Sequence, residues 1–263
     1  MICAGIDAGS RAIKVTLLDA GTRRVLAQGV ADQGVRQQER AAALLARTLA
    51  EAGAGQGAVR HMVATGYGRN AIAMADTTIT EITCHGRGVH HLCPDARTVV
   101  DIGGQDSKLL HLAGGGRVRD FAMNDRCAAG TGRFLEVVAE RLGIGLEALG
   151  AAAAAAEKPA AISSMCVVFA ETEIIGLLAA GESPENIVAG VQSSIAARTA
   201  AMAGRRVDGT VVFTGGVALI PGMDRALGKA LDTPVRIAEN PRFTGSLGAA
   251  LLAAEKHRRG EPA

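Results

Sequence analysis

Two cysteines each stand directly before a stretch of chain that could begin a helix. Cys127 lies in MNDRCAAGTGRFLE (residues 123–136), and Cys166 lies in SSMCVVFAETE (residues 163–173). Apolar residues recur at helical spacing after both of them. The backbone N–H groups and the positive end of each helix dipole would face whatever the thiolates bind, which favours an anionic ligand. Two thiols are too few for a tetrahedral zinc or a four-cysteine iron–sulfur cluster, so a cluster would need two chains around a twofold axis.

The chain has five cysteines, and their odd number and irregular spacing argue against a disulfide framework. Cys3 lies within an apolar run, and Cys84 and Cys93 lack the C-x2-C spacing of a metal site, so we expect these three to be structural. An ordinary buried thiol is the alternative interpretation of Cys127 and Cys166.

A second pattern occurs twice, once at the start of each half of the chain. Asp7, Gly9 and Lys14 follow the spacing D-x-G-x4-K, and Asp101, Gly103 and Lys108 repeat it between apolar strands. One copy is typical of many β-hairpins, but two copies indicate a duplicated lobe. We therefore expect two related lobes with a nucleotide between them.

The residue types in these loops suit the binding of a nucleoside triphosphate. Asp7 and Asp101 each end a strand, where a carboxylate can hold Mg²⁺ through water or orient an attacking water. Glycine lets the backbone come close to phosphoryl groups, because a Cβ would obstruct them. The alternative is that both aspartates only cap turns. The residues expected to bind the nucleotide in the two loops are Asp7, Gly9, Ser10, Lys14, Gly103 and Gly104, with Asp101 and Gln105 as the catalytic pair.

A third glycine turn follows a later apolar strand. Thr210 to Thr214 (TVVFT) leads into Gly215 and Gly216, which fits a close approach to an adenosine, although a tight strand-to-helix turn would explain it nearly as well. The sequence contains no G-x-x-x-x-G-K-[ST], so the chain is not a P-loop protein.

The elements that must position these residues are strands alternating with helices. Strand patterns precede and follow each D-x-G loop, and a helix is predicted after the third strand of each lobe. We expect helices also over Leu219–Leu231 and Gly245–Lys256. The predicted class is α/β, with two β-β-β-α-β-α lobes: residues 1–96 plus 241–263, and residues 97–240, which carry both cysteines of interest.

Composition excludes several classes of function. Aromatic residues are 2% of the chain and the net charge is +2 with scattered basic residues, so base stacking and a phosphate-backbone stripe are not expected. No run of 18 apolar residues and no basic leader is present, which predicts a cytoplasmic protein without a membrane partner.

Five segments together resemble the activator ATPases of 2-hydroxyacyl-CoA dehydratases, the BadF/BadG/BcrA/BcrD-type ATPase family. The segments are DIGGQDSK (101–108), MNDRCAAGTGRFLE (123–136), CVVFAETE (166–173), TEITCHGRG (80–88) and FTGGVA (213–218).

The resemblance implies an actin-like fold of the acetate and sugar kinase type, ATP or ADP with Mg²⁺, and a homodimer. It also implies one [4Fe–4S] cluster at the dimer interface, held by Cys127 and Cys166 of each subunit. In that family the ATPase takes an electron from ferredoxin or flavodoxin and delivers it to the dehydratase.

Three alternatives stay open at this point. The first is the ATP-binding subunit of a benzoyl-CoA reductase, which belongs to the same family. The second is a small-molecule kinase, for example of an amino sugar, on the same fold, and the third is an assembly protein of actin type. A kinase would not need the pair of cysteines.

Overall fold

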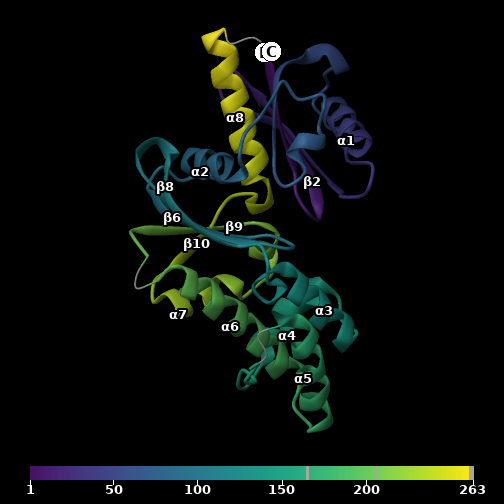
Figure 1. The fold of residues 1–263 in the computed structure, drawn as a ribbon, viewed down its shortest axis with the longest axis vertical. Helices are drawn as coiled ribbons and strands as arrows, with labels where there is room; N and C mark the ends of the chain where they lie inside the picture. Colours follow the sequence, from purple (N-terminus) through teal and green to yellow (C-terminus); the bar gives the residue numbers. More distant parts are fainter. Residues whose placement is uncertain (164–165, 205–206, 261–263) are drawn as a thin grey trace. The chain divides into compact units, whose positions relative to one another are not determined.

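The computed structural model describes residues 1–163, 166–204 and 207–260, and these form two compact units (Figure 1). The first unit comprises residues 1–95, 112–119 and 238–263, of which 261–263 lie outside the described part. The second unit comprises residues 96–111 and 120–237. Each unit is built on its own five-stranded sheet.

The sheet of the first unit has the strand order β3-β2-β1-β4-β5. β1 pairs antiparallel with β2 and parallel with β4. The elements of this unit are β1 (Ile2–Ala8), β2 (Ala12–Asp19), β3 (Val25–Asp32), α1 (Gln37–Glu51), β4 (Val59–Thr65), β5 (Thr77–Thr78), α2 (Glu81–Leu92) and α8 (Thr244–Arg259). The two-residue strand β5 has no counterpart in the sequence prediction, because so short a strand leaves no alternating pattern.

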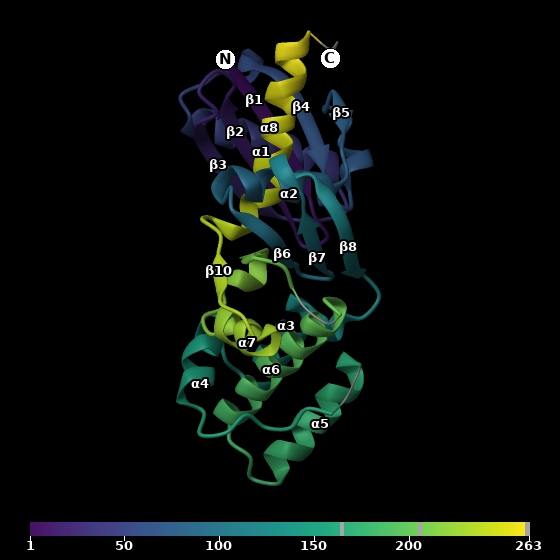
Figure 2. The ribbon, with the colours of Figure 1, turned by 90° about the vertical axis from the view of Figure 1, so that its left-hand side faces the viewer.

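Helices cover both faces of this sheet. Ala4, Ile6 and Ala8 of β1 pack with Leu44 and Leu49 of α1 on one face. The other face carries α8, which also packs along α2 (Figure 2). Helix α8 comes close to its neighbours because small residues line it: Ser246 O lies 2.0 Å from where a Cβ of Gly5 would be. Residues 3, 5 and 7 of β1 therefore face α8, and Asp7 comes to lie beside the first turn of that helix.

The second unit repeats the sheet in the order β10-β9-β6-β7-β8. β6 pairs antiparallel with β7 and parallel with β9, so β6, β7 and β9 correspond to β1, β2 and β4. The elements are β6 (Ala96–Ile102), β7 (Ser107–Leu112), β8 (Val118–Asn124), α3 (Gly132–Leu142), α4 (Leu149–Ala155), α5 (Val167–Ala179), α6 (Pro184–Met202), β9 (Thr210–Thr214), α7 (Met223–Leu231) and β10 (Val235–Ile237).

The first unit has α1 between its third and fourth strands, whereas the described residues of the second form four α-helices there, α3 to α6. Local signals set their ends: the Thr131 hydroxyl accepts from Arg133 N at the start of α3, and Ser183 caps α6 ahead of Pro184. The second core is formed mainly by β6, β9, α3 and α6. Both cysteines of interest precede helical turns of this unit.

One predicted helix begins later than expected. The sequence predicts a helix over 219–231, but α7 starts at Met223 and the residues before it form a separate 3-10 turn, Gly216–Leu219. Gly222 adopts a φ of +90°, which an α-helix cannot contain, and Pro221 precedes it. Among the described residues, no helix is long and apolar enough to cross a membrane.

Candidate functional site

The first loop places a carboxylate and an ammonium side by side at the carboxyl end of β1. Asp7 and Lys14 are register partners on β1 and β2, and Lys14 Nζ donates to Asp7 Oδ2 at 3.1 Å. The Asp7 side chain is buried, and a Cβ on Gly245 in the first turn of α8 would lie 3.2 Å from Asp7 Oδ2. The Asp7 carboxylate therefore lies at the N-terminal end of α8, where the helix dipole is positive.

The second loop repeats this pair in a more buried form. Asp101 and Lys108 are register partners on β6 and β7, with Lys108 Nζ 3.5 Å from Asp101 Oδ2. Lys108 also donates to Asp106 Oδ2 at 2.7 Å, and Thr214 Oγ1 donates to Asp101 Oδ1 at 2.8 Å. The carboxylate of Asp101 is thereby fixed from two sides at the end of its strand.

The repeat extends to a Thr-Gly pair that sequence reasoning missed in the first lobe. Thr65 lies opposite Asp7 in the parallel pairing of β1 with β4, and Thr214 lies opposite Asp101 in that of β6 with β9. The glycine after each threonine, Gly66 or Gly215, has a φ of +89°. The signal in the sequence is Thr-Gly directly after an apolar strand, which occurs at both places.

Both of these glycines lie against the aspartate of their own lobe. A Cβ on Gly66 would lie 2.4 Å from Asp7 Oδ1, and a Cβ on Gly215 would lie 2.2 Å from Ile102 O and 3.0 Å from Asp101 Oδ1. Backbone, rather than a side chain, therefore lines the space in front of each carboxylate. A phosphate needs such a surface in order to come close to main-chain N–H groups.

Turns hold the other predicted loop residues. Gly9 N donates to Ala12 O at 3.1 Å, and Gly103 N donates to Asp106 O at 2.9 Å, so the two loops close in the same way. The first unit thus gathers one set of predicted residues at the end of β1, namely Asp7, Gly9, Ser10 and Lys14. The second unit gathers the other set at the ends of β6 and β9, namely Asp101, Gly103, Gly104, Gln105, Gly215 and Gly216.

Cys127 and Cys166 are the two most accessible thiols of the chain. Cys127 is half-buried ahead of the 3-10 turn Ala128–Gly130, and Cys166 is exposed at the start of α5. Within the described residues, no group of three or more His, Cys, Asp and Glu side chains is placed to hold a metal ion. Two accessible thiols, each before a helical turn, supply half of the ligands that a four-cysteine cluster requires. The donor set therefore fits a cluster only as one half of a site.

The other three cysteines are unsuited to binding a metal. Cys3, Cys84 and Cys93 are all buried in the first unit. Burial raises the pKa of Cys84 to about 12 and also raises that of Cys3. Since the thiolate is the form that binds metal, these two side chains remain protonated at neutral pH.

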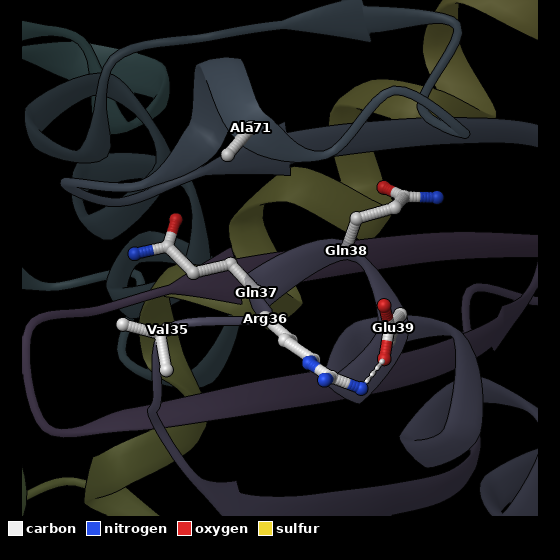
Figure 3. A pocket seen from close by; sticks show the side chains of 6 residues that line it. All are labelled: Val35, Arg36, Gln37, Gln38, Glu39 and Ala71. Carbon is white, nitrogen blue, oxygen red and sulfur yellow. Dashed lines mark hydrogen bonds and ion pairs between the residues drawn. The ribbon is translucent and has the colours of Figure 1, made fainter.

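A shallow cavity of about 250 Å³ lies at the first turn of α1 (Figure 3). Its lining residues are Val35, Arg36, Gln37, Gln38, Glu39 and Ala71. Arg36 and Glu39 form an ion pair of 3.4 Å beside it, with both side chains largely exposed. None of the predicted site residues lines this cavity, so we place no ligand there.

Comparison with known proteins identifies the family. Residues 4–253, nearly the whole chain, match the BadF/BadG/BcrA/BcrD ATPase family. The chain belongs to this family. A curated relative, the activator of lactoyl-CoA dehydratase from Anaerotignum propionicum, is 44% identical over 257 residues, covering 97% of this chain and 98% of the relative.

Relatives within the BadF/BadG/BcrA/BcrD ATPase family include a solved structure. The activator of the 2-hydroxyisocaproyl-CoA dehydratase from Clostridium difficile, with bound ADPNP, has a TM-score of 0.93 at 38% identity, covering 99% of this chain and 97% of that one. One of the subunits of benzoyl-CoA reductase from Thauera aromatica is 33% identical, covering 98% of this chain and 95% of the relative. The predicted α/β, actin-like fold is confirmed.

Proposed function

We propose that this protein is an ATP-dependent activator that takes an electron from ferredoxin or flavodoxin and delivers it to a 2-hydroxyacyl-CoA dehydratase. One observation carries the proposal: a single unit holds both accessible thiols, Cys127 and Cys166, together with the Asp101 loop. The full-length similarity to two dehydratase activators, at 44% and 38% identity, supports the same conclusion. A small-molecule kinase has no use for the two thiols.

The residues of the two loops would hold ATP and Mg²⁺. Asp7 and Asp101 would bind Mg²⁺ through water, and the glycines of the two turns would let phosphate oxygens come close to the main chain. Lys14 is partly exposed and can reach a phosphate, whereas Lys108 is committed to two carboxylates. Gln105 is exposed beside Asp101 and would orient the attacking water. Gly215 and Gly216 would face the adenosine.

Cys127 and Cys166 would bind one [4Fe–4S] cluster jointly with the same two residues of a second copy. A bound cluster supplies one-electron transfer at low potential. A helical turn follows each thiol, and the unpaired N–H groups at its start would favour the negative charge of a bound cluster, each by about 0.3–1 kcal/mol when exposed. The exposed apolar side chains of α5 directly after Cys166, which are Val168, Phe169 and Ile175, suit burial between two copies.

Anaerobic purification tests the proposal. We expect roughly four iron and four sulfide per dimer in the wild type, from the composition of one cluster. Cys127→Ser and Cys166→Ser should lose the iron and the visible absorption while keeping the circular dichroism spectrum of the fold. Cys93→Ser, the same change at a buried thiol, is the matched control and should keep the iron. If the two serine variants kept wild-type iron, the assignment would be wrong.

The benzoyl-CoA reductase system is the second candidate, because one component of that enzyme is 33% identical to this chain. A reconstitution distinguishes the two partners. The reduced protein with ATP should activate a purified 2-hydroxyacyl-CoA dehydratase and leave the substrate-binding component of a benzoyl-CoA reductase inactive. The reverse result would assign the chain to the reductase. A cytoplasmic location follows from the proposal, since ferredoxin, flavodoxin and reduced thiols are found in that compartment.

A further inference from the structure

The glycine loop after Asp101 is hydrogen-bonded to the first turn of α3. Gly132 N donates to Gly103 O at 2.9 Å, and Arg133 N donates to Gly104 O at 2.9 Å. The first N–H groups of a helix have no partner within the helix, and here two of them bond to the loop itself. A displacement of Gly103 or Gly104 therefore acts directly on the start of α3.

Gly132 lies close to both glycine loops of the second unit. A Cβ at this position would lie 3.1 Å from Gly103 O, 3.4 Å from Gly104 Cα and 3.2 Å from Val217 Cγ2. Val217 follows the Gly215–Gly216 turn, so both glycine loops of the second unit contact the same residue. A methyl group here would be tightly packed, so the helix start and the loops would have to shift apart by a few tenths of an ångström.

The same short segment holds Cys127 at its other end. Asn124 binds the backbone of Cys127 on both sides: its Oδ1 accepts from Cys127 N at 3.0 Å, and its Nδ2 donates to Cys127 O at 2.8 Å. Thr131, fully buried, donates from its hydroxyl to Ala128 O at 2.8 Å. The chain from Asn124 to Gly132 is thus fixed by hydrogen bonds at each turn.

We propose that Gly132 and Asn124 are positioning residues, which transmit the state of the nucleotide loop to the thiol of Cys127. A ligand that moves Gly103 and Gly104 shifts the start of α3, and the bonded segment carries the shift to Cys127. Cys166 directly precedes α5, outside this segment, and serves as an internal comparison. The inference rests on the proposed function at one point, because it assumes that the ligand of the Gly103 loop is a nucleoside triphosphate.

The test uses the full-length protein without iron, so that no activity is needed. The rate of alkylation of each cysteine by iodoacetamide is measured by mass spectrometry, with and without Mg²⁺ and the non-hydrolysable analogue AMP-PNP. In the wild type we expect AMP-PNP to change the rate at Cys127 at least threefold, and the rate at Cys166 by less. Equal rates at Cys127 with and without bound AMP-PNP would overturn the proposal, as would failure of the analogue to bind.

Two variants test whether the effect of AMP-PNP reaches Cys127 through Gly132 and Asn124. Gly132→Ala should bind AMP-PNP within about threefold of the wild-type affinity and lose the nucleotide effect at Cys127. Gly57→Ala, at a glycine with open space around it, should keep the effect. Asn124→Ala leaves the contact of α3 with the Gly103 loop unchanged. It should make Cys127 react fast both with and without AMP-PNP. This second variant keeps the proposal testable if Gly132→Ala does not fold. A nucleotide effect preserved in either Gly132→Ala or Asn124→Ala would contradict it.

The iron content of the wild type separates this inference from the proposed function. A wild type that binds no iron but shows the nucleotide effect at Cys127 would refute the cluster and support the transmission. A wild type that binds a cluster but shows no nucleotide effect at Cys127 would support the cluster and refute the transmission.

Discussion

Lys108 is buried near the start of β7, with its ammonium nitrogen 3.5 Å from Oδ2 of Asp101. The equivalent residue of the first unit, Lys14, lies 3.1 Å from Asp7 but keeps 19% of its side chain exposed, against 2% for Lys108. The difference comes from Asp106, a second carboxylate 2.7 Å from Lys108 Nζ. Ala12 stands at the matching position of the first loop. The two copies of D-x-G-x4-K therefore differ in the freedom of their lysines.

Replacing the two lysines by methionine should separate a structural role from a binding role. Lys108→Met removes the cation from the buried carboxylate of Asp101 and the half-buried one of Asp106, and we expect a loss of about 3–5 kcal/mol in the free energy of unfolding. Lys14→Met should cost less stability, since its pair is partly exposed, and should weaken nucleotide binding in a protein that remains folded. Urea unfolding and nucleotide titration of both variants measure this. Equal losses of stability would show that the difference in burial is unimportant.

Gly215 and Gly216 should respond differently to alanine. Gly215 combines a φ of +89° with Ile102 O at 2.2 Å from a Cβ, so Gly215→Ala should lose at least about 1–3 kcal/mol of stability through backbone strain alone. Gly216 has no atom within 4 Å of a Cβ, and Gly216→Ala should keep the wild-type unfolding midpoint. Similar unfolding midpoints for the two variants would contradict the prediction that an alanine at position 215 is strained.

Gly66→Ala should lose stability as Gly215→Ala does, if the Thr-Gly turn has the same role in both lobes. Gly66→Ala places a methyl group against Asp7 Oδ1, so we expect weaker nucleotide binding, by tenfold or more, together with lower stability. Isothermal titration with AMP-PNP checks the first effect. Gly55→Ala, at an open position of the same unit, is the control and should bind like the wild type. Wild-type affinity in Gly66→Ala would remove this loop from the nucleotide site.

The stability of the first unit should fall in alkaline solution because of Cys84. Burial raises its pKa from 9.0 to about 12, so between these values the unfolded chain releases a proton that the folded chain retains. Stability from this residue is complete below pH 9 and decreases by about 1.4 kcal/mol per pH unit above it. Unfolding in urea at pH 8 and pH 10.5 should show a smaller decrease for Cys84→Ser than for the wild type. An equal decrease would mean that Cys84 titrates normally in the fold.

The repeated strands and D-x-G-x4-K loops could be predicted from the sequence, because each copy is a local pattern of neighbouring residues. Strands 1 to 3 and 6 to 8 show apolar runs broken by glycine, and the D-x-G-x4-K spacing places Asp and Lys opposite one another in a hairpin of fixed register. The short strand β5 and the late start of α7 were not predicted. Contacts with a neighbouring strand and a positive φ at Gly222 decided those two features.

The sequence by itself determined which residue types stand at the ends of the strands, and that two thiols precede helical turns. Only the tertiary structure decided that Lys108 is shared by two carboxylates, that Thr65-Gly66 matches Thr214-Gly215, and that Gly132 contacts the Gly103 loop. The first depends on the direction in which the buried Lys108 side chain points, and the other two depend on residues far apart in the chain or on how closely two backbones approach. The spacing of residues along a sequence records neither quantity, because both are set by the packing of whole elements.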